Sequence, residues 1–369
     1  MFRPPLPGDR HLSRFRRLDF SKSPLLAFYE VTQACDLVCG HCRACAQSEP
    51  HPAELSSAES QRLIDQLGEF PNPPRLILTG GDPLKRADIF ELIEYATNTG
   101  IRVSITPSAT PLVTRDAIRQ LRVSGIEQMA ISIDGASAAT HDALRGSPGS
   151  FRRSLEILAD ARAENIPLQV NTTLSPQNFD QIDELADLLA GLGIAMWSVF
   201  FLVPVGRAAG MPRLTPIEYE IAFKRLWRHT RRQPYAIKTT EAPHYRRYVI
   251  QHQFPRGTKA QSGSAPRGYM PMGVNDGRGV MFISHAGLIH PSGFLPIVCG
   301  MFPLDHVVNI YQNSPIFQGL RDADRLEGKC HVCEFRHLCG GSRARAYAVT
   351  GNLYAQEPDC LYIPVVQRS

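Results

Sequence analysis

Cys35-Asp36-Leu37-Val38-Cys39-Gly40-His41-Cys42 is the segment on which the interpretation of the whole chain depends. Its three cysteines are separated by three residues and then by two. Three thiolates at this spacing can bind one side of a cuboidal iron–sulfur cluster, in which each iron normally takes one cysteine. The fourth iron then stays open to a reactant, and an open metal position is typical of reactive sites.

Two other interpretations stay open on these residues alone. Cys45 follows two residues after Cys42, so the run can also supply four thiolates and close the cluster, as in a ferredoxin. Cysteine pairs at this spacing also suit a tetrahedral zinc ion. A non-enzymatic iron–sulfur electron-transfer protein and a zinc-binding protein are therefore the alternatives to a reactive cluster.

The other cysteines of the 369-residue chain also favour metal binding. There are nine in all, four of them at 35–45 and four at 330–360, with Cys299 between the two groups. A clustered, odd-numbered set argues for metal ligation over disulfides. The first 20 residues lack the apolar core of a secretory signal. We therefore expect a cytoplasmic protein, in which thiols stay reduced.

Composition excludes two classes of partner. No stretch approaches the ~20 consecutive apolar residues of a membrane span, and a hydrophobic content of 43% is ordinary for a globular protein. The net charge of +5 is mild, and no aromatic side chains are interleaved with the basic runs as in nucleic-acid readers. We expect neither a membrane nor a nucleic acid as a partner.

Outward from the cysteines, strand-like and helix-like segments alternate. Short apolar runs lie at 25–31, 75–79, 101–106, 128–133, 167–173 and 195–203. Amphipathic stretches between them lie at 56–69, 86–99, 114–124, 150–165 and 178–192. About six such repeats predict an α/β fold with a parallel sheet and helical crossovers. The cysteine run follows the first strand, at the end where such folds carry their chemistry.

The cysteine spacing resembles the signature of the radical SAM family. The resemblance implies a [4Fe–4S] cluster on Cys35, Cys39 and Cys42 whose open iron chelates the amino and carboxylate groups of S-adenosylmethionine (SAM). It also implies a partial (β/α)6 TIM-type barrel, followed by a small cysteine-rich SPASM/twitch-type α+β domain. The relatives it resembles most are the radical SAM proteins of haem and haem-d1 biosynthesis.

Several further residues match positions that bind SAM in that family. By itself Gly80-Gly81-Asp82-Pro83 is a common turn, but after the second strand it matches a glycine-rich segment, usually Gly-Gly-Glu-Pro, that receives the methionyl ammonium. The resemblance implies further SAM-side or substrate-side contacts from the ends of later strands and from the cysteine loop: His41, Ser108, Ser132, Asp134, Arg145 and Val203. Arg145 would pair with the SAM carboxylate, which an arginine fork suits.

The second cysteine group lies near the C-terminus, at Cys330, Cys333, Cys339 and Cys360. Four thiolates can fill a [4Fe–4S] cluster or bind zinc. Beside the first motif, the group resembles the SPASM extension, which in its full form has seven cysteines and two auxiliary clusters. Arg343 stands where a further cysteine is expected, so the resemblance implies a single auxiliary [4Fe–4S] cluster. Cys45 and Cys299 are left over.

The predicted organisation has three parts: an N-terminal arm at 1–24, the barrel at 25–235, and a linker with the SPASM/twitch-type domain at 236–369. A long irregular loop at 256–279 is expected to connect barrel and extension and to border the substrate entrance.

The resemblance implies the function: reductive cleavage of SAM to a 5′-deoxyadenosyl radical that abstracts hydrogen from a substrate. The substrate expected first is a tetrapyrrole side chain, whose carboxylates Arg207, Arg343 and Arg345 could bind. The alternative is a ribosomally synthesised peptide. The reaction needs a reductant such as ferredoxin or flavodoxin, and the sequence identifies no catalytic acid–base pair.

Overall fold

The computed structural model describes residues 19–253 and 273–367. Its centre is one sheet in the order β10-β9-β8-β1-β2-β3-β4-β5-β6-β7, and neighbouring strands from β1 to β7 run parallel. Six strands coincide with the predicted apolar runs: β1 (Leu26–Thr32), β2 (Arg75–Gly80), β3 (Val103–Ile105), β4 (Gln128–Ser132), β5 (Leu168–Leu174) and β6 (Met196–Phe201). The α/β class with a partial TIM-type barrel is confirmed.

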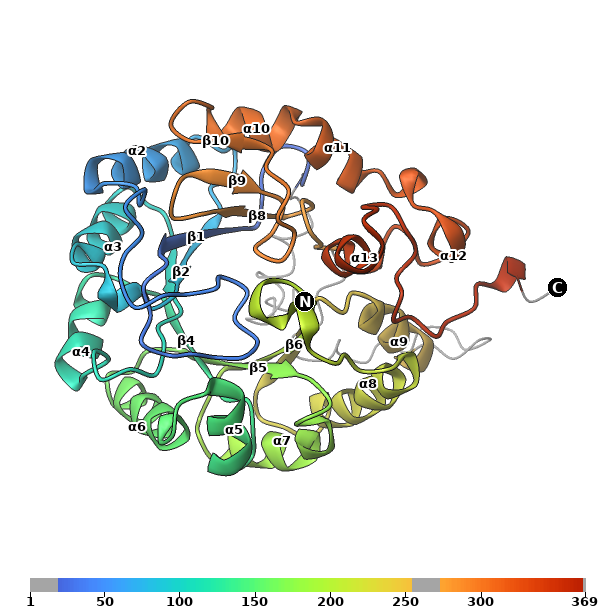
Figure 1. Ribbon diagram of the computed structural model, residues 1–369, viewed down its shortest axis with the longest axis horizontal. Coiled ribbons are helices and arrows are strands. Elements are labelled where there is room, and N and C mark those ends of the chain that lie inside the picture. The colour runs from blue at the N-terminus through green and yellow to red at the C-terminus, as the bar shows by residue number, and fades with distance from the viewer. Residues whose placement is uncertain (1–18, 254–272, 368–369) are drawn as a thin grey trace, which may run out of the picture.

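Helices follow the strands and lie outside the sheet (Figure 1). They are α2 (Ser57–Gly68), α3 (Ile89–Asn98), α4 (Arg115–Val123), α5 (Ala138–Arg145), α6 (Ser150–Ala163), α7 (Ile182–Ala190) and α8 (Pro216–Thr230). Local sequence fixes where they begin. The Ser56 side chain accepts a hydrogen bond from the Glu59 amide, and the Ser56 amide donates to the Glu59 carboxylate, which completes a capping box at α2. Thr215 and Glu218 form the same motif at α8, where Pro216 occupies the first turn.

The sheet continues beyond the strands that were predicted. β7 (Ala236–Thr240) pairs with β6, so the sheet crosses the boundary expected at residues 235 and 236. β8 (Val280–Ile283) returns to pair in parallel with β1, and β9 (Leu288–His290) and β10 (Gly300–Met301) follow in antiparallel pairs. β7 and β10 are the two ends of the described sheet.

Further helices, in the C-terminal part of the chain, are α9 (His244–Gln253), α10 (Val307–Asn313), α11 (Pro315–Arg321), α12 (Gly328–His331) and α13 (Arg343–Thr350). Of these, α10 lies beside α2 and α9 beside α8, and α12 and α13 lie between these two groups (Figure 1). Tyr311 joins α10 to the core, with its ring 5.5 Å from that of Phe70 in an edge contact. Residues 1–18 of the predicted N-terminal arm (1–24) and 256–272 of the predicted irregular loop (256–279) lie outside the described residues.

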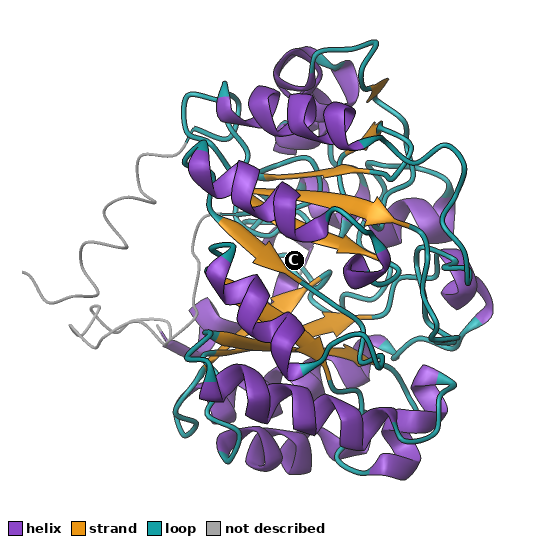
Figure 2. Cartoon of the chain, turned by 90° about the vertical axis from the view of Figure 1, so that its left-hand side faces the viewer, coloured by secondary structure: helices purple, strands orange, loops and turns teal. Residues whose placement is uncertain are grey.

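The main core fills the layer between the strands and the surrounding helices (Figure 2). Trp197 on β6 is fully buried, and its indole N–H donates to the Thr172 hydroxyl at 2.9 Å. No helix within 19–253 or 273–367 has both the length and the apolarity to cross a membrane.

Substituting Leu63 on α2 with alanine should lower the free energy of unfolding by about 2–5 kcal/mol, because its side chain is completely buried against the sheet and its loss leaves a cavity. The control is Val123→Ala on α4, a side chain that is 80% exposed, where we expect a change below about 0.5 kcal/mol. Urea unfolding of both variants measures the difference. Equal effects at the two sites would contradict the assignment of this core.

Candidate functional site

A cavity of about 970 Å³ lies inside the curved sheet, near the upper end of the size range for ligand pockets. Its lining comes from strands β1 to β8 and from loops that follow them. Cys35, Cys39 and Cys42 all line it. Ligand sites in (β/α) folds gather on the loops at the carboxyl ends of the strands, so this cavity is the candidate site.

The cysteine loop has no regular secondary structure and is held by backbone contacts. The Cys35 amide donates to the Gln47 carbonyl at 2.7 Å, and the Gly40 amide donates to the Leu144 carbonyl at 3.2 Å. Cys35 and Cys39 are each only 7% exposed, and burial raises the pKa of the Cys35 thiol. Cys45 is exposed and does not line the cavity, which therefore receives three of the four local cysteines.

Two N–H groups already point at the sulfurs of this loop. The Leu37 amide donates to Cys35 Sγ at 3.3 Å, and Arg145 Nη1 donates to Cys39 Sγ at 3.7 Å. Such donors stabilise thiolate charge, and they are among the groups that set the potential of an iron–sulfur cluster. The three cysteines and their surroundings therefore fit a cluster.

Gly80 and Gly81 are required because backbones approach closely. A Cβ on Gly80 would lie 2.3 Å from the Thr32 oxygen, and one on Gly81 would lie 2.2 Å from the Ala34 oxygen. The end of β2 is thus packed directly on the chain that enters the cysteine loop. Both glycines also line the cavity.

Asp82 lies behind the cavity wall rather than in it. Its side chain is fully buried and accepts hydrogen bonds from the Thr110 hydroxyl at 2.6 Å and the Ser108 amide at 3.3 Å. Burial raises its pKa. The Ser108 hydroxyl donates to the Gly81 carbonyl at 2.9 Å and does line the cavity. Pro83 is buried behind the wall. Asp82 joins the loops after β2 and β3.

Asp134 is the buried anchor of the opposite wall. It is completely buried, accepts the Thr173 amide at 2.7 Å, and pairs with Arg145 Nη2 at 2.6 Å. Burial raises the Asp134 pKa, but the charge of Arg145, together with His41, His141 and the Thr173 amide, outweighs burial and lowers the pKa overall. His41 lies 3.5 Å from the same carboxylate, and burial lowers its pKa to about 4, leaving the imidazole neutral. His41, Ser132 and Arg145 line the cavity, whereas Asp134 orients Arg145 from behind.

Two residues after β6 differ in where they lie. Val203 is nearly buried in a small apolar cluster with Leu295, Ala344 and Leu353 and does not line the cavity. Arg207 does line it, and its Nε and Nη2 are buried without a hydrogen-bond partner in the described structure. A buried guanidinium without a partner is costly, so Arg207 is suited to an anionic ligand.

The second cysteine group surrounds a pocket of its own. Its lining includes all four cysteines predicted to act together: Cys330, Cys333, Cys339 and Cys360. The Glu357 amide donates to Cys330 Sγ at 3.3 Å and the Gly341 amide to Cys339 Sγ at 3.4 Å. His244 lines the same pocket, is 1% exposed, and has no partner for either ring nitrogen in the described chain. The donors and the unpartnered imidazole fit a sulfur-rich ligand.

Within the described ranges, no three His, Cys, Asp or Glu side chains converge as the ligands of a single metal ion do. Each iron of a cuboidal cluster takes only one thiolate, so the ligands of a cluster surround a larger space than those of one ion.

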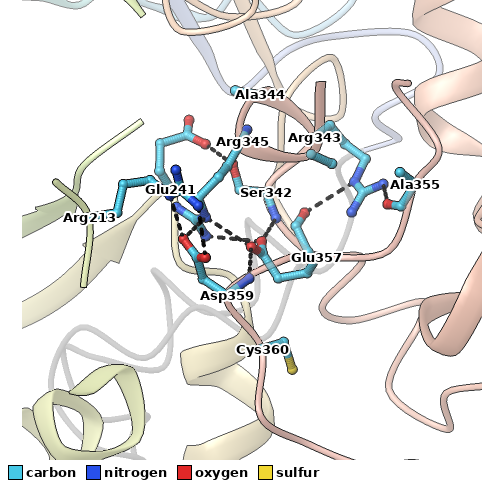
Figure 3. A network of polar contacts seen from close by, with 12 residues as sticks. Arg213, Glu241, Ser342, Arg343, Ala344, Arg345, Ala355, Glu357, Asp359 and Cys360 are labelled. Atoms are coloured by element: carbon cyan, nitrogen blue, oxygen red, sulfur yellow. Dashed lines mark hydrogen bonds and ion pairs between the residues drawn. The ribbon is translucent and has the colours of Figure 1, made fainter. Parts of the chain in front are cut away.

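Arg343 and Arg345 are structural, and the prediction that they bind a substrate is wrong. Figure 3 shows them inside a network of polar contacts. Arg345 is completely buried and pairs with Glu357 at 2.8 Å and Asp359 at 3.2 Å. Arg343 Nη1 donates to the Ala355 carbonyl at 2.8 Å. Arg345 lowers the Glu357 pKa to about 2 against the effect of burial. The network holds the segment that ends at Cys360.

Sequence reasoning missed Lys238 and Glu241, both of which line the cavity. They lie in and after β7, whose run Ala-Ile-Lys-Thr-Thr carries only a weak strand signal from its β-branched residues. It also missed His244, because nothing in the sequence links the start of α9 to the distant cysteines.

Comparisons with known proteins agree with this geometry. The family model described as the radical SAM superfamily matches residues 29–189. An AdoMet-dependent heme synthase from Methanosarcina barkeri is 37% identical, with 93% of this chain and 98% of the relative covered. A pre-heme d1 synthase from Dinoroseobacter shibae is 27% identical, with 91% and 85% covered.

Among solved structures, Streptococcus suis SuiB superposes with a TM-score of 0.71 at 18% identity, covering 96% of this chain and 80% of SuiB. That likeness supports the fold. The family implies a [4Fe–4S] cluster and SAM as its cofactors. The family model matches residues 29–189, the heme synthase relative is 37% identical over 93% of this chain, and three cysteines line the cavity. This chain therefore belongs to the radical SAM superfamily of enzymes.

Proposed function

We propose that this enzyme alters a carboxylated side chain of a tetrapyrrole. The observation that carries the proposal is a single cavity lined by three cysteines and by the cationic side chains of Arg145 and Arg207. The heme synthase relative, similar over nearly its whole length, supports the same class of substrate. Carboxylates are the groups that an unpartnered guanidinium binds best.

Cys35, Cys39 and Cys42 would hold the catalytic [4Fe–4S] cluster. When bound, cluster and SAM supply the 5′-deoxyadenosyl radical that removes a hydrogen atom from the substrate. The chain's own residues position the reactants. Arg145, fixed by Asp134 at 2.6 Å, would present its remaining N–H groups to the SAM carboxylate. On the opposite wall, Gly80 and Gly81 leave space for SAM because they carry no side chains.

Cys330, Cys333, Cys339 and Cys360 would hold one auxiliary [4Fe–4S] cluster. The two amide donors to sulfur and the unpartnered His244 support this ligand set. Such a cluster can accept the electron left on the product. A cytoplasmic reductant such as ferredoxin or flavodoxin would supply the electron for the first cluster.

The cysteine assignment predicts an iron count. After anaerobic reconstitution, the wild type should bind about eight irons per chain, and Cys35→Ala/Cys39→Ala/Cys42→Ala about four. Of these two proteins, only the wild type should release 5′-deoxyadenosine from SAM. Cys45→Ala is the matched control and should keep both the iron and the activity, because Cys45 is exposed outside the cavity. Loss of four irons in the control would contradict the assignment.

The substrate class is tested with iron coproporphyrin, a porphyrin with propionate side chains. Wild-type enzyme with SAM and reductant should form 5′-deoxyadenosine and change the porphyrin mass by mass spectrometry. Arg207→Met should raise KM for the porphyrin about tenfold or more without weakening SAM binding, because one carboxylate loses its charged partner. Arg152→Met, at a side chain that is 83% exposed, should behave as wild type.

An unchanged porphyrin mass, together with turnover on a ribosomally synthesised peptide, would replace the tetrapyrrole by the peptide class. Tightly bound zinc with no SAM cleavage would contradict both substrate classes, because the protein would then not cleave SAM at all.

A further inference from the structure

Lys238 is a cation inside the barrel that the chemistry proposed above does not use. It lies on β7 and lines the central cavity. Among residues 19–253 and 273–367, no carboxylate lies within ion-pair distance of its ammonium group, whereas Arg75 and Arg145, which line the same cavity, each have an acidic partner. The charge that acts on the Lys238 pKa is the cation of Arg75 on β2. Glu127, the only acid paired with Arg75 in the described structure, is also shared with Arg102.

Strand register places Lys238 in one polar row across the sheet. Ser132 on β4 pairs with Asn171 on β5, Asn171 with Ser198 on β6, and Ser198 with Lys238. Neighbouring strands are about 4.8 Å apart, so this row extends across the cavity from the wall that carries Ser132 to the end of the sheet. Ser132, Asn171 and Lys238 all line the cavity.

The same cavity offers flat apolar surfaces beside this row. Phe28, Phe200 and Phe282 line it, and the Phe200 ring lies 6.1 Å from that of Phe294. Aromatic side chains pack well against a planar macrocycle. A ligand that fits has an apolar, planar centre and an anionic side chain that can reach Lys238.

An ammonium group enclosed in a protein without a counter-charge is unfavourable. Burial and the repulsion from Arg75 lower the Lys238 pKa to about 8. An incoming carboxylate would supply the missing counter-charge, and the hydroxyl and amide groups of the row would accept or donate the remaining hydrogen bonds.

We propose that Lys238 is a carboxylate-binding residue that anchors one side chain of the substrate, separately from Arg207. The inference rests on the proposed function, since it names a second contact to the same class of substrate. Arg207 follows β6 beside the cysteine loop, with its amide bonded to the Cys42 carbonyl at 3.0 Å, whereas Lys238 lies within the neighbouring strand. Two anchors on adjacent elements would fix the orientation of the macrocycle relative to the cysteines.

The test compares two porphyrins on the reconstituted enzyme with SAM present. One is iron coproporphyrin, and the other is its amide, in which neutral propionamides replace the propionates. Soret absorbance titrations give Kd for each. Wild type should bind the acid more tightly. Lys238→Met should raise the Kd of the acid about tenfold or more. It should leave the Kd of the amide, the affinity for SAM and the iron content unchanged. Lys238→Arg should retain most of the preference for the acid.

Lys224→Met, which removes an exposed lysine from α8, is the matched control and should bind as wild type. If Lys238→Met does not fold, Lys238→Gln provides the same comparison. If the wild type and the folded neutral variant bind the acid with the same Kd, Lys238 does not bind a substrate carboxylate. The same conclusion follows if the variant loses affinity for the acid and the amide by the same factor. Failure of the wild type to bind either porphyrin would instead contradict the proposed function.

Discussion

The structure depends on holding an irregular loop of three cysteines in one conformation. No helix or strand fixes that loop, so the ends of other elements do. β2 packs its glycines on the incoming chain, the last turn of α5 accepts the Gly40 amide, and the turn after β6 donates to the Cys42 carbonyl. A parallel sheet suits this purpose because the ends of all its strands meet at one edge.

The buried charges divide into two groups with different roles. Arg345 has two carboxylate partners within the protein and stabilises the C-terminal segment. Arg207 and Lys238 line the cavity, with the Arg207 nitrogens partly unpartnered and Lys238 without an acidic partner in the described residues. Arg145 combines the roles, because Asp134 fixes one of its nitrogens while the side chain still faces the cavity. Carboxylate partners inside the protein therefore distinguish Arg345 from Arg207 and Lys238, which line the cavity without such a partner among the described residues.

Local patterns in the sequence were sufficient for the first six strands and their helices, since continuous apolar runs and caps such as Ser56 are encoded nearby. β7 was not predicted because polar residues make up three of its five positions, which weakens the apolar signal of the run Ala-Ile-Lys-Thr-Thr. β8 pairs with β1 across some 250 residues of chain, and no local pattern encodes that contact. The roles expected for Arg343 and Arg345 were wrong because their partners, near Glu357, are brought close only by folding. Asp82 and Val203 matched family positions in order along the chain, but the fold turns both away from the cavity.

The central claim is that Cys35, Cys39 and Cys42 leave one iron open to SAM. Electron paramagnetic resonance of the reconstituted, reduced enzyme tests it most directly, with and without SAM. A variant lacking Cys330, Cys333, Cys339 and Cys360 isolates the first cluster. We expect SAM to change the spectrum of that cluster, and the same change to occur in Cys45→Ala. If SAM does not change the spectrum of the wild type, or if Cys45→Ala alone alters it, the cluster has no open iron.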